Sequence, residues 1–227
     1  MQRRILWIVA FALTALSGCA EPVSRHENAR ILLMGDSMMA VHAMTGAAVA
    51  DAMERRLQQP VIDRSVIGAR FLYRLPVSGA AGLNIPKQYR NGDWDWVVLN
   101  GGGNDILFGC GCGPCAQRID RLISKDGRKG AIPGFVSRLR RDGAQVLFVG
   151  YMRTPGVTSP IEHCVDEGRE MDARLARLAA LDSGVHFLSL DGLVPHGDRS
   201  YHGMDLVHPS AKGSDAIAAR IVDRIAP

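Results

Sequence analysis

The chain has 227 residues, of which 47% are hydrophobic, enough for one globular domain with a sizeable core. Its formal net charge of +4 is too small to indicate a nucleic-acid-binding protein. The densest arginine cluster, at 138–141, is interpreted as the solvated face of a helix, so we expect no nucleic-acid partner.

The first 18 residues have the pattern of a signal peptide. Arg3 and Arg4 precede an apolar stretch from Ile5 to Leu16, which is shorter than the ~20 residues that span a bilayer. The stretch ends in Leu16-Ser17-Gly18-Cys19, which looks like a bacterial lipobox in which Cys19 is lipidated and becomes the mature N-terminus. A plain secretory signal with an incidental cysteine is the alternative.

These patterns predict a signal peptide over 1–18, a tether over 19–29 and one domain over 30–227. A lipid anchor at Cys19 would hold the protein to a membrane surface, as a cell-envelope lipoprotein on the periplasmic side. Under the alternative, the exported protein is soluble, either secreted or periplasmic.

From residue 30, short apolar runs alternate with longer helical patterns, as is typical of βαβ units around a parallel sheet. Five runs are predicted strands: Ile31–Met34, Val61–Ile67, Trp96–Leu99, Gln145–Val149 and His186–Leu190. Helical patterns cover 39–57, 116–124, 132–142 and 166–182.

Two of these helical patterns predict which side chains face the core. In 39–57, Met44 and Met53 are interpreted as core filler. In 166–182, apolar residues face inward, and three arginines are expected to face outward: Arg169, Arg174 and Arg177.

The first apolar run ends in Gly35-Asp36-Ser37. The glycine allows a sharp exit from the strand, which places Ser37 at the carboxyl end of the sheet, where ligands bind in open α/β folds. The same three residues are also an ordinary turn and helix N-cap sequence.

Glycines recur after the second and third predicted strands. Gly68 either permits a positive φ or has a functional role. The run Gly101-Gly102-Gly103-Asn104-Asp105 follows the third strand, and its glycines would let the backbone approach a ligand closely. Asn104 supplies an amide donor, although it could also be an Asx-turn residue.

Four titratable side chains fall in one loop near the C-terminus: His196, His202, Asp205 and His208. Nothing fixes a ligand spacing among them, so we predict no metal site. Pro209 biases His208 toward an extended conformation, and Ser210 can cap the final helix. His208 is therefore held immediately before a rigid element, a suitable mounting for a general base.

If Cys19 is lipidated, four cysteines remain: Cys110, Cys112, Cys115 and Cys164. Three pairings are possible, and the sequence does not choose among them. The first three also resemble a metal-binding knuckle, to which Cys164 and His163 could add ligands, but export favours two disulfides over zinc. Both cysteine-bearing loops leave the carboxyl edge of the sheet, where Ser37 also lies, so both should border a ligand-binding pocket at that edge.

Taken in order, the Gly35-Asp36-Ser37 turn, Gly68, the Gly101–Asp105 run and Asp205-Leu206-Val207-His208-Pro209 resemble the four signature blocks of the SGNH/GDSL hydrolase family. The resemblance covers most of the chain after residue 30. It implies a three-layer α/β/α sandwich with a flavodoxin-like, parallel five-stranded sheet. The family often has an additional Asn or Gly just before the second block, which Arg64-Ser65-Val66 does not reproduce.

The resemblance also implies site roles. A serine hydroxyl needs a base to accept its proton and a third group to orient that base, and Ser37, His208 and Asp205 fill these roles. The oxyanion donors would be the backbone N–H groups of Ser37 and Gly68 and the side-chain amide of Asn104.

The sequence therefore predicts an exported serine esterase that hydrolyses carboxylic esters of small molecules or glycans and needs no cofactor. Two alternatives stay open: an acyltransferase to a sugar acceptor, and a non-catalytic binding module on the same fold. No oligomeric state follows from the sequence.

Overall fold

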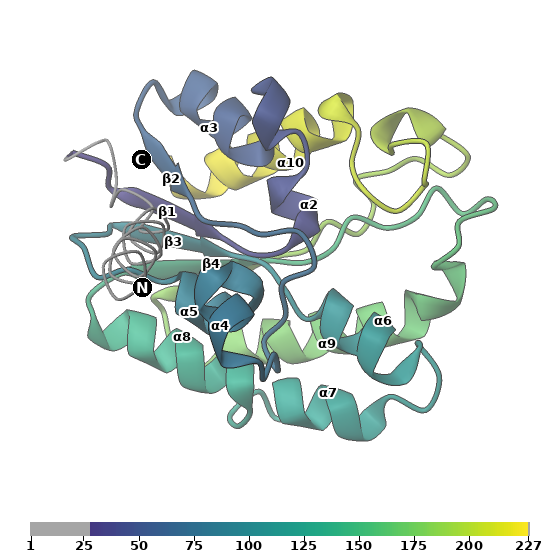
Figure 1. The fold of residues 1–227 in the computed structure, drawn as a ribbon, viewed down its shortest axis with the longest axis horizontal. Helices are drawn as coiled ribbons and strands as arrows, with labels where there is room; N and C mark the ends of the chain where they lie inside the picture. The colour runs from purple at the N-terminus through teal and green to yellow at the C-terminus, as the bar shows by residue number, and fades with distance from the viewer. Residues whose placement is uncertain (1–27, 227) are drawn as a thin grey trace, which may run out of the picture.

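The computed structural model describes residues 28–226 (Figure 1). The predicted signal peptide over 1–18, Cys19 and all of the predicted tether except residues 28 and 29 lie outside the described residues. The described chain contains a five-stranded, fully parallel sheet in the order β2-β1-β3-β4-β5. The strands are β1 (Ile31–Met34), β2 (Val61–Asp63), β3 (Trp96–Leu99), β4 (Gln145–Val149) and β5 (Val185–Leu188).

The sheet confirms the predicted fold class, and β1, β3 and β4 have the predicted bounds. The second strand ends at Asp63 rather than Ile67, because the Asp63 carboxylate accepts the N–H and the hydroxyl of Ser65 and replaces the regular strand by a local turn. The chain still follows β1 there, since the N–H groups of Arg64 and Val66 donate to the carbonyls of Leu33 and Gly35. The fifth strand begins one residue earlier than predicted and ends at Leu188, two residues before the predicted end.

Alternate residues of the central strands point into two separate hydrophobic cores, as expected for strands covered on both faces. Leu32 and Met34 of β1 pack into one core, and Ile31 and Leu33 pack into the other. The result is the three-layer sandwich seen in Figure 1.

One face of the sheet is covered by α2 (Ser37–Ala40), α3 (Val49–Leu57) and α10 (Ala211–Ile225). The other face carries α4 (Pro76–Ser78), α5 (Ile85–Gln88), α6 (Gly103–Cys110), α7 (Ala116–Leu122), α8 (Ala131–Arg141) and α9 (Val165–Ala179). No helix between residues 28 and 226 combines the length and the apolarity needed to cross a membrane.

The helix predicted over 39–57 is broken in the structure. Helix α2 ends at Ala40, and α3 begins only at Val49, after a short 3₁₀ turn flanked by left-handed backbone at His42 and Gly46. Met53 lies in the core as predicted, whereas the prediction for Met44 was wrong, because this break turns its side chain fully into solvent.

The outward orientation predicted for Arg174 was also wrong. Its side chain is only 2% exposed, and Nη1 donates to the Asp120 carboxylate at 2.6 Å and to the Ile123 carbonyl at 2.7 Å. Its Nε donates to Glu170 at 2.7 Å. A helical pattern does not reveal that a neighbouring segment supplies acceptors for a buried cation.

Candidate active site

Ser37 is the first residue of α2, directly beyond the carboxyl end of β1. Asp36 caps this short helix by accepting the Met38 N–H at 3.1 Å. The turn is braced from the other side by the buried Gln88, whose amide accepts the Gly35 N–H at 2.9 Å and donates to the Gly35 carbonyl at 2.8 Å. The strand order reverses between β1 and β3, which places this turn at the crevice where α/β sheets bind ligands.

His208 lies between Ser37 and Asp205. Its Nε2 is 2.9 Å from the Ser37 hydroxyl oxygen, and its Nδ1 is 2.6 Å from Asp205 Oδ2. The second Asp205 oxygen accepts the backbone N–H groups of Val207 and His208, both at 3.0 Å. Desolvation by burial raises the pKa of the Asp205 carboxyl. The hydrogen bonds with the His208 ring and with the two backbone N–H groups outweigh this effect, so the pKa is lowered.

The segment around His208 is fixed on both sides. The Pro209 carbonyl is 3.0 Å from His42 Nε2, and the backbone at Pro209 bridges to His202. Ser210 caps α10 by accepting the Gly213 N–H at 3.2 Å, as the sequence predicts. These contacts hold the backbone on both sides of His208, and so hold its ring in place beside Ser37.

Gly68 and Asn104 line the same pocket as Ser37 and His208. The backbone of Gly68 has φ of 79°, a conformation that favours glycine. Asn104 Nδ2 donates to the Ala69 carbonyl at 3.2 Å, which uses one of its two amide hydrogens. The structure thus brings all of the predicted oxyanion donors to one pocket.

Asp105 holds the Gly68 loop against α6. It is buried, and its two oxygens accept the N–H groups of Phe71 and Leu72, each at 2.8 Å. Burial raises the pKa of Asp105, although these two hydrogen bonds oppose the shift. The spacing between Asn104 and the Gly68 loop is therefore fixed by the residue next to Asn104.

Sequence reasoning missed Tyr151, which joins the Ser37 turn to the Asn104 helix. Its hydroxyl donates to the Asp36 carboxylate and accepts the Gly103 N–H at 2.9 Å. Burial raises the pKa of Asp36 to about 6, against the hydrogen bonds from Tyr151 and Met38, and burial also raises the pKa of Tyr151. The position of Tyr151 at the end of β4, on the same sheet edge as Ser37, was the one available signal.

Two of the three glycines at 101–103 occupy positions where a side chain has no room. A Cβ at Gly101 would lie 2.3 Å from Ile85, and one at Gly103 would lie 2.7 Å from the Tyr151 ring. The backbone therefore passes close to the protein's own side chains on its way to Asn104. Gly103 also lines the pocket that holds Ser37 and His208, and a close approach of this backbone to a ligand stays a prediction.

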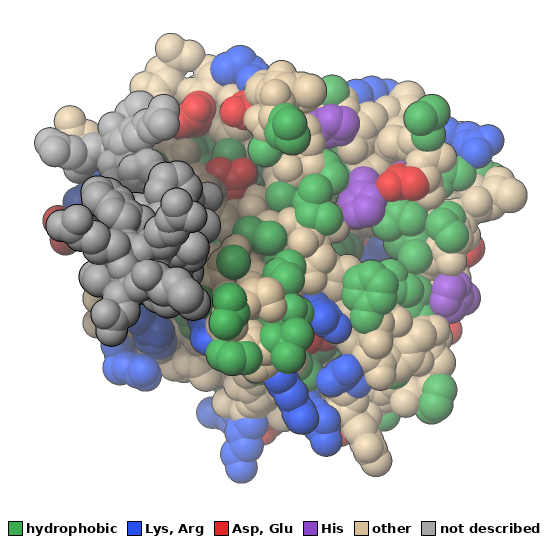
Figure 2. All heavy atoms as spheres, viewed as in Figure 1, with side chains coloured by type: hydrophobic (Ala, Val, Ile, Leu, Met, Phe, Trp, Pro, Cys, Tyr) green, Lys and Arg blue, Asp and Glu red, His purple; other side chains and the backbone are tan. Residues whose placement is uncertain are grey.

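Ser37 opens into a pocket of about 290 Å³, hereafter the Ser37 pocket. Its walls come mainly from α6, α9 and the segment that follows β4. Ile67 and Phe108 belong to its lining yet are 63% and 66% exposed, so the pocket has an apolar rim. Figure 2 shows one face of the molecule, on which hydrophobic side chains gather near the centre and Lys and Arg side chains gather below them.

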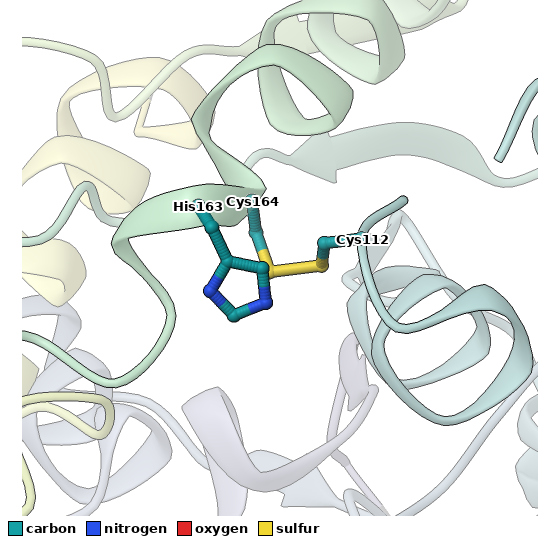
Figure 3. A group of neighbouring side chains, drawn as sticks. All are labelled: Cys112, His163 and Cys164. Atoms are coloured by element: carbon teal, nitrogen blue, oxygen red, sulfur yellow. A yellow bond between two sulfur atoms is a disulfide. The ribbon is translucent and has the colours of Figure 1, made fainter. Parts of the chain in front are cut away.

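The four cysteines after Cys19 form two disulfides, Cys110–Cys115 and Cys112–Cys164. Cys112 and Cys164 line the Ser37 pocket, so both predicted loops reach it. In Figure 3 the His163 ring lies beside the second disulfide, and the ligand atoms of the three residues are within 4.8 Å of one another. Both sulfurs are bonded to each other and offer no thiolate, so this donor set does not fit zinc.

Among the described residues, the loop that carries His196, His202, Asp205 and His208 contains no group of three closely spaced ligand atoms. Within residues 28–226, the Cys112, His163 and Cys164 group is the one set of three such side chains with ligand atoms close together. His202 is buried, and desolvation lowers its pKa despite a hydrogen bond to the backbone of Arg153.

A family model described as the GDSL-like Lipase/Acylhydrolase family matches residues 33–216. Comparison with curated proteins gives no match. Among solved structures, TesA is 21% identical, with 87% of this chain and 98% of that chain covered and a TM-score of 0.59.

Two solved esterases are similar in fold. The acetyl xylan esterase Est2A from the rumen bacterium Butyrivibrio proteoclasticus is 16% identical, with 90% and 64% of the two chains covered and a TM-score of 0.57. A carbohydrate esterase family 2 enzyme with a carbohydrate binding domain, from Corynascus thermopiles (Myceliophthora fergusii), is 16% identical, with 91% and 68% covered and a TM-score of 0.56. At these identities the likeness is one of fold.

Proposed function

The chain belongs to the GDSL-like lipase/acylhydrolase family, and on that premise we propose that it is an exported serine esterase that hydrolyses carboxylic esters. The observation that carries the proposal is the hydrogen-bonded series from Ser37 through His208 to Asp205. A nucleophile within reach of a base, which is itself oriented by a carboxylate, is the arrangement that covalent acyl transfer needs.

The partners of the His208 ring indicate which of its nitrogens carries the hydrogen. The Asp205 carboxylate accepts hydrogen bonds only, so Nδ1 carries the hydrogen that points at Asp205. Nε2 of the neutral ring then has a free lone pair for the Ser37 hydroxyl. His208 is therefore set to take the Ser37 proton as the serine oxygen attacks the ester carbonyl.

The developing oxyanion would be stabilised by the backbone N–H groups of Ser37 and Gly68 and by the Asn104 amide, which all lie at the Ser37 pocket. His208 then gives its proton to the departing alcohol oxygen, which leaves an ester on Ser37. Water deprotonated by His208 attacks this ester, and the reverse proton transfer frees Ser37 and the carboxylic acid.

Export is part of the proposal. The two disulfides among the described residues suit an oxidising compartment rather than the cytosol. We place the mature protein at a membrane surface, held by lipid on Cys19.

Hydrolysis kinetics test the proposed reaction. Ser37→Ala should lower p-nitrophenyl acetate turnover by at least ~10³-fold, because removal of a triad member disables the covalent route. Ser65→Ala is the matched control, since Ser65 bonds to Asp63 outside the Ser37 pocket and should keep wild-type rates. Turnover by Ser37→Ala close to that of the wild type would refute the proposal.

A further inference from the structure

The Ser37 pocket extends well beyond the groups that the proposed reaction uses. At one end lie Ser37, Asn104 and His208, and the remaining lining is largely apolar. Six of these side chains are Ile106 and Leu107 on α6, Met152 after β4, Ile161, and Val165 and Met171 on α9. A site built only for ester cleavage would not need this apolar extension.

Three polar side chains line this extension: Arg153, Thr154 and Glu167. Arg153 and Thr154 have partners outside the lining, and the Glu167 carboxylate would repel an anionic group. Thr154 donates to Glu162 at 2.6 Å, and Arg153 forms an ion pair with Asp172 at 2.6 Å. The paired arginine does not provide a free cation for a phosphate or a carboxylate. The extension therefore suits a neutral, apolar group, because an unpaired polar group buried there would lose its hydration without replacement.

The volume limits the size of that group. At roughly 30 Å³ for each water-sized group, a pocket of about 290 Å³ holds on the order of ten non-hydrogen atoms. An acetyl group would leave most of this space unfilled, whereas an acyl chain of roughly six to ten carbons would fill it.

One covalent bond joins the two walls of the pocket. Cys112 lies in the loop that follows α6, and Cys164 immediately precedes α9, 52 positions further along the chain (Figure 3). Cys112 and Cys164 also form part of the lining themselves. The other disulfide, Cys110–Cys115, joins two residues only five positions apart within one wall and does not line the pocket.

We propose that the Ser37 pocket binds the acyl chain of a medium-chain ester and that the Cys112–Cys164 disulfide holds its walls at the width that chain needs. The disulfide is then a determinant of acyl-chain length. This inference rests on the proposed ester hydrolysis, which supplies the acyl group.

A chain-length series tests the pocket. With p-nitrophenyl esters from acetate to palmitate, kcat/KM should rise by about fourfold per methylene that enters the pocket. The maximum should fall between hexanoate and decanoate, at roughly 10²-fold above acetate for hexanoate and up to roughly 10⁵-fold for decanoate. A maximum at acetate with a steady decline would overturn the pocket inference and leave the esterase proposal standing. Failure to hydrolyse any ester, with Ser37 unlabelled by a fluorophosphonate, would overturn both.

The two disulfides provide a matched pair of variants. Cys112→Ala with Cys164→Ala should lower the octanoate-to-acetate ratio of kcat/KM by at least ~10-fold, because the walls lose their link. Cys110→Ala with Cys115→Ala should keep that ratio within about twofold of the wild type, since this bridge lies outside the pocket. An unchanged ratio in the first variant would overturn the role of the disulfide.

Val165→Phe gives a second readout that does not depend on folding without the disulfide. It adds four non-hydrogen atoms to the α9 wall and should shift the preferred ester to shorter chains by roughly two to four carbons. A folded Val165→Phe variant, judged by circular dichroism, with the wild-type chain-length profile would contradict the placement of the acyl chain.

Discussion

Tyr151→Phe is the perturbation that best probes how the two halves of the site are held together. The substitution removes one hydroxyl that donates to the buried Asp36 carboxylate and accepts the Gly103 N–H. Each of these two groups costs roughly 1–3 kcal/mol when left without its partner, so the free energy of unfolding should fall by about 2–6 kcal/mol. At roughly 2–4 °C per kcal/mol for a chain of this length, Tm should fall by about 4–24 °C.

The same substitution should change the pH dependence of stability. Burial raises the pKa of Asp36 to about 6, and the hydrogen bond from Tyr151 limits that rise. A carboxyl whose folded pKa lies above its unfolded value of about 3.9 stabilises the fold less as pH rises through that interval. In the wild type, this contribution should be lost between about pH 4 and about pH 6. Without Tyr151 the pKa rises further, so the loss continues above pH 6.

The stability deficit of Tyr151→Phe should therefore be larger at pH 8 than at pH 5. Urea denaturation at both pH values measures it. In parallel, kcat for ester hydrolysis should fall by roughly 10–10²-fold, because Ser37 and Asn104 lose their shared brace while the acyl pocket keeps its shape. KM should change little.

Tyr73→Phe is the matched control. This substitution also removes a tyrosine hydroxyl, one that is hydrogen-bonded to the Ser78 hydroxyl at 2.8 Å. It leaves the hydrogen bonds of Asp36 and Gly103 in place. A Tyr151→Phe variant with wild-type kcat and an equal stability deficit at both pH values would refute the bracing role.

Three further predictions concern the base, a buried cation and the anchor. His208→Ala should lower ester turnover as much as Ser37→Ala does, whereas His202→Ala should retain most activity. Asn104→Ala should lower kcat by about 10²–10³-fold. If His202→Ala were inactive and His208→Ala were not, the base would be His202 instead. Arg174→Met should lower the free energy of unfolding by roughly 1–3 kcal/mol in urea titrations, because its buried donors disappear while its carboxylate partners stay partly hydrated; unchanged stability would contradict this. In a bacterial host the protein should incorporate labelled fatty acid and partition into detergent, and Cys19→Ser should abolish both; an unmodified Cys19 would leave the plain secretory signal.

The parts of the fold that sequence reasoning placed correctly are those that local pattern controls. Strands β1, β3 and β4 are continuously apolar because helices cover both faces of the sheet, and their bounds were predictable for that reason. The break after Ala40 and the buried Arg174 were not predictable. The break depends on a turn that hydrophobic periodicity does not indicate. The burial of Arg174 depends on Asp120, an acceptor that is distant in the sequence.

The candidate site divides in the same way. Motif order led to Ser37, Asp205 and His208, and the structure brings these side chains together, although their catalytic roles stay predictions. Tyr151 and Gln88 escaped notice because each acts through one tertiary hydrogen-bond network and belongs to no short motif. Disulfide pairing was equally out of reach, since only the meeting of the α6–α7 loop with the start of α9 selects Cys112–Cys164.

The central claim is that Ser37 is a nucleophile activated by His208, and mapping a fluorophosphonate adduct tests it most directly. After the mature protein reacts with the probe, tandem mass spectrometry should place one adduct per chain on Ser37. His208→Ala should slow labelling by at least ~10²-fold, because the hydroxyl loses its base. An adduct on any other residue, or labelling of Ser37 at the same rate without His208, would contradict the account.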